Sequence, residues 1–221
     1  MNAIASFVFS PFAENTYVIA DPGGTCVIID PGCSDAVERR ELEAYILDNH
    51  LTPVHLLNTH CHIDHVFGNA FVAARFQLEL ASHRGEQEVL NAAGPFADAF
   101  GVPFEPSPAI SRFLEPGQVV EFGQTQLEVL FVPGHSPASI AFYNRKEGYV
   151  IAGDTLFAGS IGRTDLPGGS APVLLASIER ELLSLPDQTR ILSGHMQETT
   201  VGRERKSNPF LLAWKQGLPI G

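Results

Sequence analysis

The sequence predicts an α/β fold in which two β-sheets pack face to face and helices cover the outer face of each sheet. Apolar residues make up 44% of the 221-residue chain, which is enough to form one sizeable core. Runs of β-branched and aromatic residues, separated by Pro and Gly, are accompanied by helical segments in both halves of the chain. Strands and helices in each half favour an αβ/βα sandwich, which we expect to span residues 1–221 as a single domain.

The first half begins with three strands and a helix. The helix starts at Asp35, which lies three residues before Glu38 and so has the spacing of a capping box. A short apolar strand comes next and is followed by a segment rich in histidine. We expect strands at 3–9, 15–20, 25–30, 54–58 and 78–82, and helices at 35–49, 68–76 and 85–93.

The segment 94–117 separates the two halves and differs from them in composition, because it contains five prolines and four phenylalanines. We expect a long irregular connection here. Since such connections are commonly functional, we expect it to lie over a binding site. The second half then returns to regular structure, with strands at 118–122, 125–132, 138–144, 148–153 and 189–193, a Gly-rich loop at 159–169, a helix at 171–184 and a C-terminal helix.

Charge and composition limit the expected partners and location. The formal net charge of −11 disfavours nucleic acid and anionic membranes as partners. No apolar stretch reaches the roughly 20 residues of a membrane helix, and the first residues lack the pattern of a signal peptide. The cysteines, Cys26, Cys33 and Cys61, are few and odd in number, so we expect free thiols and a cytoplasmic location. No sequence feature indicates an oligomeric state.

The clearest chemical signal is the segment Thr59-His60-Cys61-His62-Ile63-Asp64-His65, which directly follows the strand at 54–58. In extended backbone alternate side chains share a face, so His60, His62 and Asp64 should point the same way. Cys61 should point away from them as a buried, small apolar residue. Because imidazole and carboxylate groups are ligands of zinc, iron and manganese, the segment predicts a metal site.

Three more candidate ligands follow the ends of apolar strands in the second half. They are His135, Asp154 and His195, and each is directly preceded by glycine. Glycine allows a sharp turn or a close approach of the backbone. Because four strand ends carry histidine or aspartate, we expect them to meet at one edge of the fold.

Other polar residues have plainer interpretations. His50 and His55 are expected to be structural, and His83 is expected to cap the helix that follows it. Asp30 follows the third strand, where it either makes only a turn before Pro31 or supports a metal ligand from behind.

This pattern resembles the metallo-β-lactamase superfamily. The shared features are the HxHxDH motif, the later single His, Asp and His, and the early segment 28–32. The resemblance covers nearly the whole chain and implies the four-layer metallo-β-lactamase sandwich. It also implies two divalent metal ions; zinc is expected, although His and Asp sites also accept iron or manganese. The first ion would be bound by His60, His62, His135 and Asp154, and the second by Asp64, His65, Asp154 and His195.

Within the superfamily, the chain is similar to short bacterial glyoxalase II-like proteins, which are hydroxyacylglutathione hydrolase-like. The similarity lies in segments 161–165, 195–202 and 208–210. It implies hydrolysis of an anionic small-molecule thioester, such as S-lactoylglutathione, by a metal-bound hydroxide that Asp64 orients as the catalytic carboxylate. Arg163 and Asp165 replace a Lys and a Tyr of the family's glutathione-binding loop, so Arg163 is the expected substrate-binding residue. The C-terminal helical domain of full-length glyoxalase II is not expected.

Other reactions remain open at this point. Persulfide dioxygenases, with a mononuclear iron centre, share the ligands of the first metal and a loop like that at 162–165. Another ester or a phosphodiester is also an open substrate class, although the acidic charge and the lack of a basic arm argue against a nuclease. Asp154 is unlike the corresponding position of true β-lactamases. The complete ligand set argues against a binding protein that kept only the fold.

Overall fold

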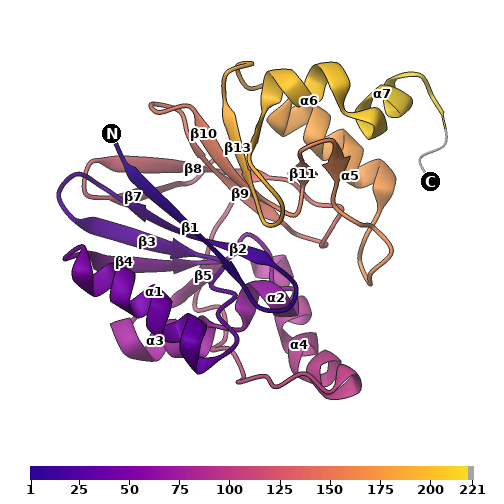
Figure 1. Ribbon diagram of the computed structural model, residues 1–221. Helices are drawn as coiled ribbons and strands as arrows, with labels where there is room; N and C mark the ends of the chain where they lie inside the picture. Colours follow the sequence, from indigo (N-terminus) through magenta and orange to yellow (C-terminus); the bar gives the residue numbers. More distant parts are fainter. Residues whose placement is uncertain (219–221) are drawn as a thin grey trace.

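Two six-stranded β-sheets form the centre of the molecule, and helices lie on both outer sides (Figure 1). The structure is a computed structural model and describes residues 1–218. The first sheet contains, in spatial order, β1 (Ala3–Phe9), β2 (Glu14–Ala20), β3 (Thr25–Ile29), β4 (Thr52–Leu57), β5 (Leu80–Ser82) and β6 (Arg112–Phe113). The second contains β14 (Thr199–Thr200), β13 (Arg190–Ser193), β10 (Tyr149–Gly153), β9 (Ile140–Asn144), β8 (Thr125–Phe131) and β7 (Val119–Phe122). A separate hairpin is formed by β11 (Leu156–Phe157) and β12 (Ser160–Ile161).

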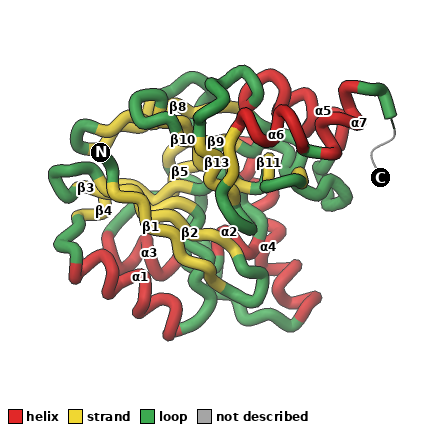
Figure 2. Tube along the Cα trace, turned by 45° about the horizontal axis from the view of Figure 1, so that its top comes forward, coloured by secondary structure: helices red, strands yellow, loops and turns green. Residues whose placement is uncertain are grey.

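Two groups of helices cover the sheets, and Figure 2 shows them on opposite sides of the strands. The first sheet is covered by α1 (Ala36–Asp48), α3 (Asn69–Phe76) and α4 (Gln87–Phe100). The second is covered by α5 (Ala171–Ser177), a π-helical turn (Ile178–Leu182), α6 (Val201–Ser207) and α7 (Pro209–Lys215). Two shorter elements, α2 (Ile63–Val66) and a 3-10 turn (Arg84–Glu86), stand near the site described below.

Side chains from alternate positions of the central strands fill separate layers of the core. In β3, Val27 and Ile29 pack between the two sheets, whereas Cys26 and Ile28 pack against the helices of the first sheet. Strands buried on both faces have near-continuous apolar sequences, which is why these strands stand out in the chain. The predicted αβ/βα four-layer sandwich is confirmed.

The segment 94–117 differs from its prediction. The prediction of an irregular connection is wrong for residues 94–100, which form the last turns of α4, and for 112–113, which form β6. Pro95 removes one hydrogen bond from α4, but the helix persists because Leu90, Ala93 and Ala97 are buried along one face. The irregular part of the segment is therefore limited to 101–111 and 114–117.

The other predicted elements are present with small changes in their bounds. The helix predicted at 171–184 ends in the π-helical turn, and the C-terminal helix is divided into α6 and α7. The division occurs where Asn208 caps α7 by accepting the backbone N–H of Phe210 at 3.1 Å. Pro209 occupies the first position of α7, where its missing N–H costs nothing. Within residues 1–218, no helix combines the length and the apolar character that crossing a membrane requires.

Candidate metal centre

The predicted ligands meet at one edge of the two sheets, where β4, β8, β10 and β13 end. The histidine-rich segment is extended only as far as His62, and α2 begins at the next residue. The prediction of a fully extended segment is therefore wrong from Ile63 onward. The helical turn places His65 beside Asp64, with Nε2 of His65 3.9 Å from Oδ2 of Asp64.

A first group of ligand atoms belongs to His60, His62 and His135. Nε2 of His135 lies 2.9 Å from Nδ1 of His62 and 3.2 Å from Nε2 of His60. Burial and neighbouring histidines lower the pKa of all three imidazoles, and for His62 the pKa falls to about 4. The three rings are therefore neutral at pH 7, and each has one nitrogen with a free electron pair.

Hydrogen bonds decide which nitrogen carries the proton in two of these rings, those of His135 and His60. His135 donates its Nδ1–H to the carbonyl oxygen of Arg163 at 2.8 Å, so its Nε2 is unprotonated. The hydroxyl of Thr59 donates to Asp30 at 2.6 Å and so accepts from Nδ1 of His60 at 3.1 Å. Nε2 of His60 is then also unprotonated. Two electron pairs face each other across 3.2 Å, an arrangement that a bound cation stabilises.

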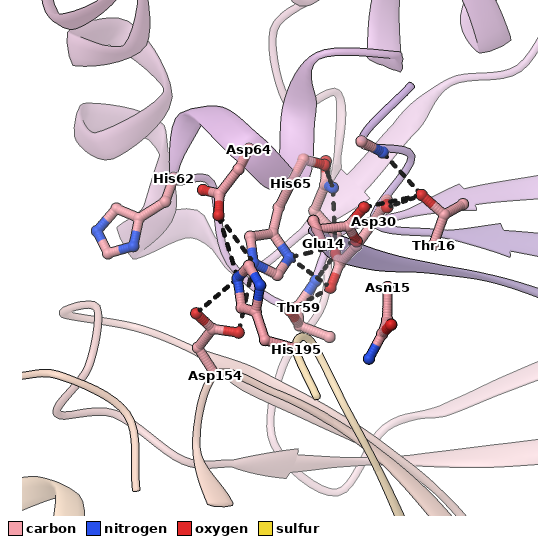
Figure 3. A network of polar contacts seen from close by, with 12 residues as sticks. Glu14, Asn15, Thr16, Asp30, Thr59, His62, Asp64, His65, Asp154 and His195 are labelled. Atoms are coloured by element: carbon pink, nitrogen blue, oxygen red, sulfur yellow. Dashed lines mark hydrogen bonds and ion pairs between the residues drawn. The ribbon is translucent and has the colours of Figure 1, made fainter. Parts of the chain in front are cut away.

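A second group of ligand atoms belongs to Asp64, His65 and His195 (Figure 3). Nε2 of His195 lies 3.2 Å from Oδ2 of Asp64, and Nδ1 of His195 donates to the carbonyl oxygen of Ala13 at 3.1 Å. Burial lowers the pKa of His65, but Asp154 and Asp64 outweigh it and hold this pKa well above its ordinary value. Carboxylates that favour a proton on an imidazole also favour a metal cation beside it.

Asp154 lies between the two groups. Its Oδ2 is 3.5 Å from Nε2 of His135 and 3.4 Å from Nε2 of His195, while its Oδ1 is 3.4 Å from Nε2 of His65. Burial raises the pKa of Asp154, but the histidines outweigh burial and hold it well below its ordinary value. Across residues 1–218, Oδ1 of Asp154 and Nε2 of His65 are among the few buried polar atoms without a hydrogen bond. This His and Asp cluster fits divalent metal ions.

Asp30 supports the cluster from behind. Its Oδ1 accepts the backbone N–H of Thr59 at 2.7 Å, and its Oδ2 lies 3.1 Å from Nδ1 of His65. Asp30 thus orients His65 directly and His60 through Thr59, and it does so from a left-handed backbone conformation with φ of 50°. The sequence left two interpretations of Asp30 open, a turn before Pro31 only or the support of a metal ligand. These contacts favour the second.

Two buried glutamates at the site were not identified from sequence. Glu14 is buried, and its Oε1 lies 3.8 Å from Nδ1 of His65. Burial raises the pKa of Glu14 well above the ordinary value. Glu86 accepts hydrogen bonds from the backbone N–H groups of Cys61 and Ala138. The polar residues at the start of β2 were a usable signal for Glu14. Glu86 lies in a polar stretch that is typical of an exposed segment, so nothing in the local sequence indicates that it is buried.

The structure explains why glycine precedes the ligands Asp154 and His195. Gly153 has φ of 51°, and a side chain there would also meet the Thr59 hydroxyl at 2.4 Å. A Cβ atom on Gly194 would lie 2.2 Å from Oδ1 of Asp154 and 2.7 Å from the ring of His65. Only glycine therefore lets the end of β13 approach the cluster.

Arg163 is close to the centre through its backbone but not through its charge. Its carbonyl oxygen accepts from His135, whereas its guanidinium forms two hydrogen bonds with Asp165, at 2.8 and 2.7 Å. Both side chains are exposed. A substrate carboxylate that binds Nε and Nη2 of Arg163 would have to displace Asp165.

Several residues that were predicted to be structural make contacts that agree with that prediction. Cys61 is fully buried and its thiol is free, as are those of Cys26 and Cys33. His83 accepts the backbone N–H of Gly85 at 3.1 Å and so caps the 3-10 turn. His55 pairs with the backbone carbonyl of Glu121 at 3.0 Å, remote from the cluster.

Comparison with known proteins places this geometry in context. Residues 10–195 match the family model of the Metallo-beta-lactamase superfamily. A probable metallo-hydrolase of Bacillus subtilis is 38% identical, and the alignment covers 91% of this chain and 93% of that protein. The hydroxyacylglutathione hydrolase GloC of Haemophilus influenzae is 35% identical, with 90% of this chain and 93% of that protein covered.

Solved structures show the same fold. TTHA1623 in a di-iron-bound form is 39% identical and superimposes with a TM-score of 0.84, covering 94% of this chain and all of that one. The B3 metallo-beta-lactamase BLEG-1 is 34% identical and has a TM-score of 0.87, covering 95% of this chain and 99% of that one.

Proposed function

Because the chain belongs to the metallo-β-lactamase superfamily, we propose that it is a metal-dependent hydrolase of glutathione thioesters such as S-lactoylglutathione. The observation that carries the hydrolase proposal is the position of Asp154 between two complete groups of ligand atoms. The thioester class is supported by the similarity to the hydroxyacylglutathione hydrolase GloC.

Each group of residues would hold one divalent ion. His60, His62 and His135 would hold the first, Asp64, His65 and His195 the second, and Asp154 would contribute to both. Zinc suits these nitrogen and oxygen donors, as do iron and manganese. When bound, two such ions lower the pKa of a water molecule and polarise a carbonyl group.

Asp64 is the proposed catalytic carboxylate. Burial raises its pKa, but His65 and His195 outweigh burial and hold it below the ordinary value, so the group is ionised. Its Oδ2 faces His195, which leaves Oδ1 to orient the attacking water and to accept its proton. The water oxygen joins the acyl carbon, the C–S bond breaks, and the proton passes from Asp64 to the departing sulfur.

The mononuclear iron alternative needs only the first group of ligands. The second group is intact in this chain, and that favours hydrolysis over oxidation of a persulfide. The three buried free thiols are compatible with the proposed cytoplasmic location, where thiols stay reduced.

The proposal is tested by loading the purified protein separately with zinc, iron or manganese and following loss of the thioester absorbance of S-lactoylglutathione. We expect hydrolysis with at least one metal and a loss of several orders of magnitude in Asp64→Ala. Oxygen consumption with glutathione persulfide, together with one iron per chain and no thioester hydrolysis, would favour the dioxygenase instead.

A further inference from the structure

A cavity of about 560 Å³ is lined in part by His62. Several of its other lining residues belong to α4, which lies next to α2 (Figure 1). One wall is a face of α4 that carries Val89, Ala92 and Phe96. These positions are three and four residues apart, so their side chains lie in one stripe along the helix. Pro95, which belongs to the segment 94–117, also lines the cavity.

Other lining residues come from loops near the metal centre. Pro137 follows His135 by two residues, and Leu166 and Pro167 follow Arg163 closely in the chain. The floor is formed by Cys61, His62 and Ile63 of the metal-binding segment. Because His62 both lines the cavity and belongs to the first group of ligand atoms, the cavity adjoins the position of a carbonyl held at the metal centre.

The residues that line the cavity indicate which kind of chemical group it would bind. No lysine or arginine lines the cavity, and its single carboxylate is that of Glu88. The two carboxylates of a glutathione moiety would be repelled by Glu88 and would have no cation to pair with there. Phe96 is 38% exposed to solvent, so an apolar group in the cavity would remove its ring from water.

We propose that this cavity binds the acyl chain of the substrate, and that within the proposed class of glutathione thioesters an unbranched alkyl chain is preferred over a small hydroxylated one such as lactoyl. This inference rests on the proposed thioester hydrolysis for its substrate class. The glutathione part of the substrate then lies outside the cavity, on the solvent side of the metal centre.

The test that is independent of catalysis is equilibrium titration of the metal-loaded protein with acetate, butanoate and hexanoate, the acids that hydrolysis would release. We expect the affinity to rise about three- to fourfold for each added methylene group. Ala92→Gln and Phe96→Ser should flatten this dependence and change acetate binding less than about twofold. Val173→Ser is the matched control, because Val173 is an exposed apolar residue on α5 that lines a different cavity.

A parallel series of acetyl-, butyryl- and hexanoylglutathione separates this inference from the proposed function. If the acids bind more tightly with length but no thioester is hydrolysed, the hydrolase proposal is wrong and the apolar subsite stands. If the thioesters are hydrolysed but neither rates nor acid affinities depend on chain length, the subsite is wrong and the hydrolase stands. An unchanged length dependence in both Ala92→Gln and Phe96→Ser would also overturn the subsite.

Discussion

Replacing Glu86 by Gln tests how the two loops of the first ligand group are held together. The buried carboxylate accepts the N–H of Cys61 at 3.0 Å and that of Ala138 at 2.8 Å, and the hydroxyl of Ser136 donates to it at 2.7 Å. Cys61 lies between two histidines of the metal-binding segment, and Ser136 follows His135. Glu86 therefore joins the two loops from behind, and it acts as a positioning residue.

The size of the effect follows from the three donors. In Glu86→Gln the amide nitrogen replaces one acceptor oxygen, so one buried N–H loses its partner, at a cost of about 1–3 kcal/mol. For a chain of this length that loss lowers Tm by roughly 3–10 °C. Because the two loops carry the ligands, we expect metal affinity to fall by roughly 10- to 100-fold as well.

Two measurements on the same variant check this reasoning. Thermal unfolding gives the loss of stability, and competition with a chelator gives the metal affinity. Glu41→Gln is the matched control, since Glu41 is an exposed glutamate on α1, a helix that contributes no ligand to the metal centre, and both quantities should stay unchanged. A lower Tm with wild-type metal affinity would refute the positioning role and leave Glu86 as a structural residue only.

The remaining predictions concern the metal centre and its loop. Asp64→Ala should bind one ion fewer per chain and lose several orders of magnitude in kcat, as shown by metal analysis and steady-state kinetics; near wild-type turnover would exclude Asp64 as the catalytic carboxylate. Gly194→Ala places a Cβ 2.2 Å from Oδ1 of Asp154 and should weaken the second site while the first stays filled; full occupancy of both sites would contradict this. Arg163→Ala should raise KM for a glutathione thioester about three- to tenfold at nearly constant kcat, less than for an unpaired arginine, because a substrate must displace Asp165. Asp165→Ala should lower KM for the same substrate, and equal effects of both variants on charged and uncharged thioesters would leave the pair only a role in stiffening the loop.

The layers of the fold could be predicted because strands buried on both faces have unmistakable apolar sequences. Because these strands were easy to recognise, His135, Asp154 and His195 could be placed just past strand ends, each after a glycine. The structural requirement at Gly194, which approaches Asp154 too closely for any side chain, explains why that local signal exists.

What could not be predicted depends on contacts between distant parts of the chain. Pro95 signals a break locally, yet burial of Leu90 and Ala97 keeps α4 helical. The turn of α2 that places His65 beside Asp64 is only four residues long, too short for a periodic pattern. Glu86 acquires its role only when segments 61 and 136–138 fold onto it.

The most direct test of the central claim is the number and spacing of metal ions in the metal-replete protein, measured by anomalous diffraction from its crystals. We expect two ions roughly 3.5–4 Å apart, with Asp154 contacting both. A single ion bound by His60, His62 and His135, with Asp64 and His195 turned away from it in fully loaded protein, would show that the proposed dinuclear centre is wrong.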